Sequence, residues 1–150
     1  MNISIEIFNW QDELYFVVKL LMALIMGAAI GWEREKAGKE AGIRTFGLIS
    51  MGACAFALVS MSLMSGDPSR IASNVVVGIG FMGGGVIFHQ NSRSHGLTTA
   101  ASLWVSASVG LSTAFGLHVM ALALCVITLI FLHLPSSKLW SNISHKRFDD

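Results

Sequence analysis

The amino-acid sequence predicts an all-α, polytopic membrane protein with five transmembrane helices, and three observations support this prediction. Of the 150 residues, 53% are hydrophobic and only 13% are charged, whereas an average soluble domain is about one quarter charged. The mean hydropathy is +0.64. Five apolar stretches reach the length of about 17–25 residues that a bilayer-crossing helix needs. This composition excludes a disordered tail, a nucleic-acid-binding protein and almost any cytosolic enzyme, so the first expected partner is the lipid bilayer.

The five predicted spans form one transmembrane domain over residues 1–134, followed by a short cytoplasmic tail at 135–150. We expect the spans at about 14–32, 45–64, 71–88, 98–115 and 117–134. Lys19 is the charged residue inside these limits, and it lies close enough to the start of its span to extend to the membrane surface. Only Gly116 separates the last two spans, which predicts a tight turn and an antiparallel helical hairpin.

The distribution of basic residues predicts the orientation of the chain. Eight Lys and Arg residues lie on the side that contains the segment 33–44, the loop after residue 88 and the C-terminal tail, and only Arg70 lies on the other side. By the positive-inside rule, the N-terminus is outside and the C-terminus is in the cytoplasm. The N-terminal stretch is acidic and is therefore not expected to be a cleavable signal.

Small residues at helical spacing predict where the helices pack against one another. Lipid provides no hydrophobic force between helices, so the close approach of two backbones has to hold them together. Gly27 and Gly31 form such a pair in the first span, and Ser102, Ser106 and Gly110 form a stripe in the fourth. These packing interfaces are more numerous than one bundle needs, which favours a homo-oligomer such as a dimer.

The third span contains five glycines within eight residues: Gly78, Gly80, Gly83, Gly84 and Gly85. Each glycine inside a helix costs up to about 1 kcal/mol, and irregular backbone at membrane depth is tolerated only against protein or a watery cavity. The stretch is therefore either the central helix of the bundle, with these glycines as packing residues, or a broken helix with exposed carbonyls. We favour the central helix.

A first group of candidate site residues lies on the outer side, at the start of the third span. Asp67 is a good N-cap residue, and Pro68 suits the first helical position. Arg70 could pair with Asp67, and Asn74 lies one turn deeper. An ordinary capped helix start explains this group equally well.

A second group lies on the inner side. The run Glu33-Arg34-Glu35-Lys36 continues the first helix out of the membrane, and it is interpreted mainly as a solvated face because Glu35 and Lys39 have the favourable i,i+4 order. Arg44 is closely flanked by apolar residues, so we expect it to be buried against Glu33 or free glycine carbonyls. On this interpretation, Arg44→Ala damages function more than Lys39→Ala.

Thr98 and Thr99 open the fourth helix, where a hydroxyl can cap free N–H groups and the helix dipole favours an anion. The histidines lack the helical spacing and the third ligand of a metal site. The serines lack the context of a catalytic nucleophile. We therefore expect no metal, no cofactor and no enzymatic activity.

Three runs resemble the MgtC/SapB family of bacterial inner-membrane proteins: GWEREKAGKEAGIRTFGLIS (31–50), DPSRIASNVVVGIGFMGGGVIF (67–88) and GLTTAASLWVSASVGLSTAFG (96–116). The similarity covers about residues 14–134 and implies a five-helix domain of the inner membrane with the N-terminus outside. The positions that match the motifs of the family are Glu33, Arg34, Gly38, Arg44, Thr45, Asp67, Arg70, Gly80, Gly83, Gly85, Thr98, Thr99 and Trp104.

The resemblance also implies a function. The family is associated with growth in low magnesium, acid tolerance and survival inside macrophages, which are stress-response and virulence traits. The leading hypothesis is a non-enzymatic regulator that binds another integral membrane protein, such as the F-type ATP synthase. The alternative is a carrier or channel for Mg²⁺ or another cation that uses Asp67, glycine carbonyls and Glu33.

Many members of this family continue into a soluble C-terminal domain that resembles an ACT fold. This sequence is expected to lack that domain, because it ends soon after the fifth span. Contacts with a partner are then expected from the membrane helices, the segment 33–44 or the short tail.

Overall fold

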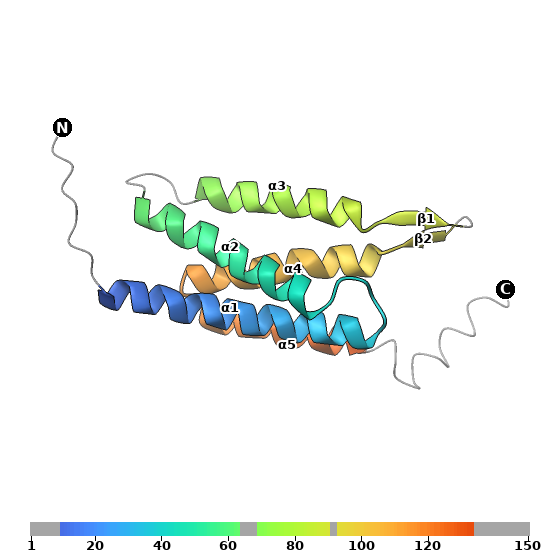
Figure 1. The fold of residues 1–150 in the computed structure, drawn as a ribbon, viewed down its shortest axis with the longest axis horizontal. Coiled ribbons are helices and arrows are strands. Elements are labelled where there is room, and N and C mark those ends of the chain that lie inside the picture. Colours follow the sequence, from blue (N-terminus) through green and yellow to red (C-terminus); the bar gives the residue numbers. More distant parts are fainter. Residues whose placement is uncertain (1–9, 64–68, 91–92, 134–150) are drawn as a thin grey trace.

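A computed structural model describes residues 10–63, 69–90 and 93–133 as five helices and one short β-hairpin (Figure 1). The elements, in chain order, are α1 (Trp10–Lys36), α2 (Ile43–Leu63), α3 (Ser69–Gly85), β1 (Phe88–Gln90), β2 (Arg93–His95), α4 (Leu97–Ala114) and α5 (His118–His133). The helices lie along one common direction (Figure 1). The prediction of five helices is confirmed, whereas the predicted tail at 135–150 lies outside the described residues.

Two helices are long and apolar enough to cross a membrane. They cover Asp12–Lys36 in α1 and Ile43–Ser62 in α2. The helix α5 is also apolar but shorter, with 16 residues, a length of about 24 Å at 1.5 Å per residue. By length and composition, the described helices therefore indicate a membrane location.

The third helix ends earlier than expected, and a β-hairpin follows it. Gly85 is the last residue of α3, and Phe88 begins the strand β1, which pairs antiparallel with β2. The rings of Phe88 and His95 stack at this pairing, with centroids 5.2 Å apart. Three successive glycines make the end of α3 a poor helix, which explains why the helix does not continue to Phe88.

The contact between α1 and α2 brings the two backbones together. A Cβ atom added to Gly27 would lie 2.6 Å from the Phe46 carbonyl oxygen and 2.6 Å from Ser50 Cβ. A Cβ atom added to Gly31 would lie 2.6 Å from the Gly42 carbonyl oxygen. Real Cβ atoms do not approach other atoms so closely, so this pair of helices can pack this way only because both positions in α1 are glycine.

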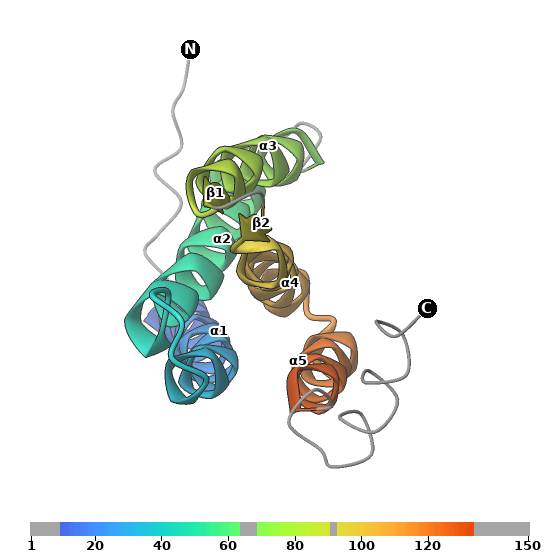
Figure 2. The ribbon, with the colours of Figure 1, turned by 90° about the vertical axis from the view of Figure 1, so that its right-hand side faces the viewer.

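The helix α4 packs in the same manner against the same stretch of α2, around Phe46 and Ser50. A Cβ atom added to Gly110 would overlap the Ser50 carbonyl oxygen. The buried Ser106 hydroxyl donates a hydrogen bond of 2.8 Å to the Phe46 carbonyl oxygen. Ser102 is buried as well, and its hydroxyl donates to a carbonyl within α4. The helix α4 contacts each of the other four helices and is the centre of the bundle (Figure 2).

The helix α3 lies at the edge of the bundle, which corrects the expectation that it is central (Figure 2). It is continuous from Ser69 to Gly85, and it packs on α4 through Gly83, whose added Cβ would lie 3.7 Å from Ala100 Cβ. A Cβ atom added to Gly80 would lie 3.9 Å from Cζ2 of the Trp104 ring. The other three glycines of the stretch have no atom within 4 Å of the Cβ position, namely Gly78, Gly84 and Gly85. The prediction that these glycines pack against another helix is therefore wrong for the helices of this chain.

A tight turn joins α4 to α5, as predicted from Gly116. This glycine has a φ of +77°, in the left-handed region that other residues rarely adopt. The Leu117 N–H donates to the Ser112 carbonyl oxygen at 2.8 Å, and the Gly116 N–H donates to the Thr113 carbonyl oxygen at 3.2 Å. This pair of bonds forms a Schellman motif, which satisfies the last carbonyls of α4 and reverses the chain.

Lys19 is held inside the bundle, which corrects the expectation that it extends to the surface. Its side chain is buried, and its ammonium donates a 2.7 Å hydrogen bond to the Ala114 carbonyl oxygen at the end of α4. The ammonium also lies 4.6 Å from the centroid of the Tyr15 ring. The last carbonyls of a helix have no partner within it and favour a cation, so Lys19 connects α1 to the C-terminus of α4.

The contact of Gly110 with α2 yields a testable prediction. We expect Gly110→Ala to lower the free energy of unfolding by roughly 1–3 kcal/mol, because the new methyl group overlaps the backbone of α2. Thermal unfolding of the detergent-solubilised protein, followed by circular dichroism, measures this effect.

The matched control is Gly52→Ala, on α2, which is the helix that Gly110 contacts. The Cβ position of Gly52 has no atom within 4 Å, so alanine there is expected to be neutral or stabilising by up to about 1 kcal/mol. Equal responses of the two variants would contradict the close backbone contact.

Candidate functional site

A polar cleft opens at the end of the bundle where α1 ends and α4 begins. We call it the rim cleft, and its volume is about 590 Å³. The structure brings together four residues that the sequence singled out, Glu33, Arg34, Thr98 and Thr99. The remaining residues of its wall are Ala37, Lys39, His95, Gly96, Leu97, Phe131 and Leu132.

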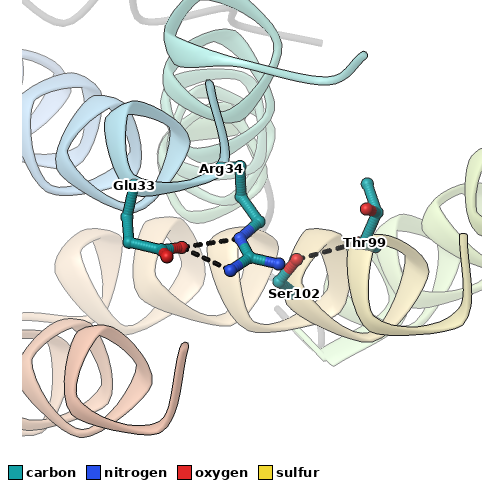
Figure 3. A network of polar contacts seen from close by, with 4 residues as sticks. All are labelled: Glu33, Arg34, Thr99 and Ser102. Atoms are coloured by element: carbon teal, nitrogen blue, oxygen red, sulfur yellow. Dashed lines mark hydrogen bonds and ion pairs between the residues drawn. The ribbon is translucent and has the colours of Figure 1, made fainter. Parts of the chain in front are cut away.

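Glu33 and Arg34 form an ion pair in this cleft (Figure 3). The Arg34 Nε donates to Glu33 Oε2 at 2.7 Å, and Arg34 Nη2 lies 2.6 Å from the same oxygen. The Arg34 side chain is only 6% exposed and the Glu33 side chain 20%. The interpretation of residues 33–36 as a solvated face is therefore wrong for Arg34, because α1 ends against α4 and the guanidinium extends toward Ser102 (Figure 3).

Glu35 has a different role from the one expected for it. Its Oε2 accepts a 3.1 Å hydrogen bond from the Ile43 N–H, in the first turn of α2. A carboxylate at a helix N-terminus satisfies a free N–H group and interacts favourably with the helix dipole. The side chain of Glu35 therefore caps the N-terminus of α2 across the loop instead of forming an ion pair with Lys39.

Arg44 is exposed, which corrects the expectation that it is buried. The face of α2 that contains Phe46 and Gly47 turns toward α1, so Arg44 points away from the bundle. Thr45 is partly buried, and neither residue lines the rim cleft. The expected difference between Arg44→Ala and Lys39→Ala loses its basis, because both side chains are exposed.

The threonines of α4 do not cap the helix, as had been expected. The N-cap residue is Gly96, with a φ of +83°, and no side chain makes a capping hydrogen bond. A Cβ atom at Gly96 would overlap the Val86 carbonyl oxygen, so glycine is required where the hairpin passes. Thr98 and Thr99 therefore lie inside the first turn, where Thr98 is exposed and Thr99 is buried.

The residues expected at the outer side do not join the rim cleft. Asp67 lies outside the described residues. Arg70 is exposed in the first turn of α3, and its carbonyl oxygen accepts a 2.8 Å hydrogen bond from the Ser73 hydroxyl. Asn74 is also exposed, and it lines an apolar groove of about 500 Å³ between α2 and α3. The start of α3 lies at the opposite end of the bundle from the rim cleft (Figure 1).

Lys39 belongs to the rim cleft, and the sequence analysis missed it. The Lys39 N–H donates to the Arg34 carbonyl oxygen, and the Gly38 N–H donates to the Glu35 carbonyl oxygen, each at 3.0 Å. Gly38 has a φ of +68°, so α1 ends in the same motif as α4. The available signal was Gly38, since a glycine after an amphipathic helix end predicts this turn and hence the position of the next residue.

Within the described ranges, no three His, Cys, Asp or Glu residues lie together as a metal site would require. The chemistry that the rim cleft offers is that of a binding site with cations, hydroxyls and a helix N-terminus. It has an apolar wall contributed by Leu97, Phe131 and Leu132.

Long apolar helices, packing interfaces of small residues and polar groups at the bundle ends define a helical membrane protein. Residues 20–137 match the sequence model described as the MgtC family. The chain therefore belongs to the MgtC family, which confirms the resemblance noted from its motifs.

Three relatives illustrate the similarity. The chain is 43% identical over 126 residues to the "Putative magnesium transporter YhiD" of Escherichia coli K12, covering 78% of this chain and 59% of the relative. It is 43% identical over 114 residues to "Protein MgtC" of Salmonella typhimurium LT2, covering 76% and 49%. It is 35% identical over 153 residues to an uncharacterized protein of Haemophilus influenzae, covering 94% and 64%.

The chain thus spans about half to three fifths of the length of the first two of these relatives. No solved structure gives a significant match to the chain.

The ion pair of the rim cleft yields a second prediction. We expect Arg34→Ala to lower the free energy of unfolding by roughly 1–3 kcal/mol, because Glu33 keeps a partly buried carboxylate without its partner. Chemical unfolding in detergent measures the change. Arg44→Ala is the control, and we expect it to stay within about 0.5 kcal/mol of the parent because Arg44 is exposed. A larger loss for Arg44→Ala than for Arg34→Ala would contradict the assignment.

Proposed function

We propose that this chain is a non-enzymatic regulator of the bacterial inner membrane that acts by binding another integral membrane protein. One observation carries the proposal, namely a free face on α3. We define this face by Ser73, Val77, Phe81 and Gly84, which follow one another at helical spacing. Val77 is 72% exposed and Phe81 87% exposed, and no atom lies within 4 Å of the Cβ position of Gly84.

The glycines inside the bundle indicate that a face with small residues serves as a contact surface for another helix. Gly27, Gly31 and Gly110 each lie against the backbone of a neighbouring helix, which is how helices associate in lipid. The free face of α3 offers the small residues Ser73 and Gly84, and no atom of the described helices lies within 4 Å of the Cβ position of Gly84. Since each interior glycine costs a helix up to about 1 kcal/mol, a transmembrane helix of a partner is the occupant that makes use of them.

The shape of the free face supports a helix as the occupant. Gly84 has no side chain, so it leaves a shallow strip beside the large Phe81 side chain. A partner helix with small residues can approach the strip closely and pack against the Phe81 ring.

The membrane placement is part of the proposal. All five helices cross the bilayer, with the N-terminus outside and the C-terminus in the cytoplasm. Eight basic residues are predicted on the cytoplasmic side and one on the outer side, which supports this orientation. The alternating direction of the five helices is consistent with it (Figure 1).

The family supplies the setting. We propose that the regulator acts when magnesium is limiting, in the context of acid tolerance and intracellular survival, and that the F-type ATP synthase is the first partner to test. Membership of the MgtC family supports this proposal, as does the magnesium-related name of one relative.

The free face yields a third prediction. We expect Gly84→Leu to reduce recovery of the partner at least about tenfold, because a leucine side chain holds the two backbones apart. Affinity purification from detergent-solubilised membranes, with the captured proteins quantified by mass spectrometry, measures the recovery.

The control is Ala123→Leu, which adds a similar volume to an exposed position of α5. This variant is expected to recover the partner fully, and both variants should unfold at the temperature of the parent. Full recovery of the partner by Gly84→Leu would contradict the proposal. Capture of a second copy of this chain as the sole Gly84-dependent partner would assign the face to a homo-oligomer instead.

Transport of Mg²⁺ or another cation is the second candidate, and the name of the Escherichia coli relative favours it. Magnesium prefers carboxylate oxygens and keeps several waters. In the described part of the chain, the Glu33 carboxylate is bound to Arg34, and the groove that contains Asn74 is otherwise lined by apolar side chains and glycine. These features support the regulator over the transporter.

Flux measurements separate the two candidates. Purified protein in liposomes that contain a magnesium-sensitive dye is expected to give no more influx than protein-free liposomes, because the described helices offer no continuous row of carboxylates. If magnesium does enter the liposomes and Asp67→Asn abolishes this influx, the chain is a transporter instead. Asp12→Asn is the charge-matched control for Asp67→Asn.

A further inference from the structure

We infer that a second copy of this chain docks in the groove between α2 and α3, and that the two Asn74 side chains pair across the axis of the dimer. The inference rests on the proposed membrane placement of the helices. It concerns a different face of α3 from the free face that was assigned to a protein partner. It starts from the groove of about 500 Å³ that contains Asn74.

Glycines in both walls leave the groove open to another helix. No atom lies within 4 Å of the Cβ position of Gly52 in α2 or of Gly78 in α3. Large exposed side chains line the same groove, among them Phe56 of α2 and Met82 of α3. Because α3 lies at the edge of the bundle (Figure 2), a neighbouring molecule can approach this surface within the membrane and place a helix between the projecting side chains.

Asn74 places a chemical requirement on whatever fills the groove. Its side chain is exposed, and no hydrogen bond or ion pair joins it to a described residue. The helix α3 has 17 residues, a length of about 25 Å, which is less than the roughly 30 Å of the hydrocarbon core. Asn74 lies five residues after Ser69, the outer end of α3, and hence about 7.5 Å along the helix.

The short side chain of Asn74 does not reach the membrane surface from this depth. An amide without a hydrogen-bonding partner in lipid costs free energy. The occupant of the groove is therefore expected to supply both a donor and an acceptor, which the hydrocarbon part of a lipid chain does not have.

A second copy of the chain supplies the matching group. An amide side chain contains donors and an acceptor, so two amides can bond to each other in both directions. In a two-fold dimer the same surface of each copy meets the other, so Asn74 of one copy faces Asn74 of the other when it lies near the axis. A single asparagine at a helix interface specifies both the register and the number of helices that associate.

The charges of this surface also favour two identical copies. A two-fold axis brings each charge near its own duplicate, and like charges placed together are unfavourable. The described residues that line the groove carry no charge, and Asn74 is the polar side chain among them. The groove is therefore a surface that two copies can share without repulsion, with α3 of each copy lying in the groove of the other.

The test measures self-association of the full chain in phosphatidylcholine vesicles. Copies labelled with a donor or an acceptor fluorophore are reconstituted together at decreasing ratios of protein to lipid, and energy transfer gives the dimer fraction. We expect a dimer that Gly78→Leu weakens at least tenfold, because leucine fills the groove, and that Asn74→Leu weakens about tenfold, because the hydrogen bonds between the amides are lost.

Gly84→Leu is the matched control for Gly78→Leu. It adds the same side chain to an equally open Cβ position of the same helix, but on the free face. We expect Gly84→Leu to dimerise as the parent does while it loses the protein partner, and Gly78→Leu to show the reverse. The two results separate a failure of this inference from a failure of the proposed function.

Oxidative cross-linking in membranes locates the contact. Ile71 lines the groove one turn outward from Asn74, so we expect Ile71→Cys to form a disulfide-linked dimer and added Asn74→Leu to reduce its yield. Val119→Cys is the control, since this residue is 85% exposed near the outer end of α5, and it should give no more cross-linked dimer than the parent. The native Cys54 and Cys125 are buried.

The inference is overturned if the chain is monomeric in vesicles, or if Gly78→Leu and Asn74→Leu dimerise as the parent does. A monomeric parent that retains a lipid which Gly78→Leu loses would assign the groove to an acyl chain. Capture of a different membrane protein that depends on Gly78 and Asn74, without a dimer, would assign it to that protein. Both of these outcomes also overturn the inference.

Discussion

The close contact of α2 with the backbones of α1 and α4 is the constraint on which the rest of the bundle depends. Glycine at positions 27, 31 and 110 lets three helices approach until backbone atoms touch, and the Ser106 hydroxyl adds a hydrogen bond to the Phe46 carbonyl oxygen. In lipid, such contacts replace the hydrophobic force that holds a soluble core together. The outer helices α3 and α5 are then positioned by α4, through Gly83 and through the turn at Gly116.

The same contact determines which polar groups meet. Because α1 ends against the start of α4, the Arg34 side chain is enclosed between the two helices and has to be neutralised, which Glu33 does. The Schellman turn at Gly38 brings Lys39 back over the same place. The end of α1 and the start of α4 thus contribute most of the polar groups of the rim cleft, and neither of these helix ends alone contains them all.

The sequence predicted the number of helices, their limits within a few residues and the turn at Gly116, since apolar length and glycine are local signals. It also identified Gly27, Gly31, Ser106 and Gly110, which the structure places between helices. It did not predict the position of α3, because a row of glycines shows that a helix can be approached closely but not which helix approaches it. The same reason applies to Arg44, since the identity of the covered face of α2 depends on distant residues.

The bond between Lys19 and Ala114 has a consequence for biosynthesis. The two residues are 95 positions apart, so at a synthesis rate of about 5–20 residues per second the acceptor emerges some 5–20 seconds after the lysine. In the proposed placement, the first helix therefore enters the bilayer before the carbonyl acceptor of Lys19 exists, and the ammonium has only the Tyr15 ring of its own helix beside it until the fourth helix arrives. The bond that connects α1 to the end of α4 can therefore form only after the fourth helix has been inserted.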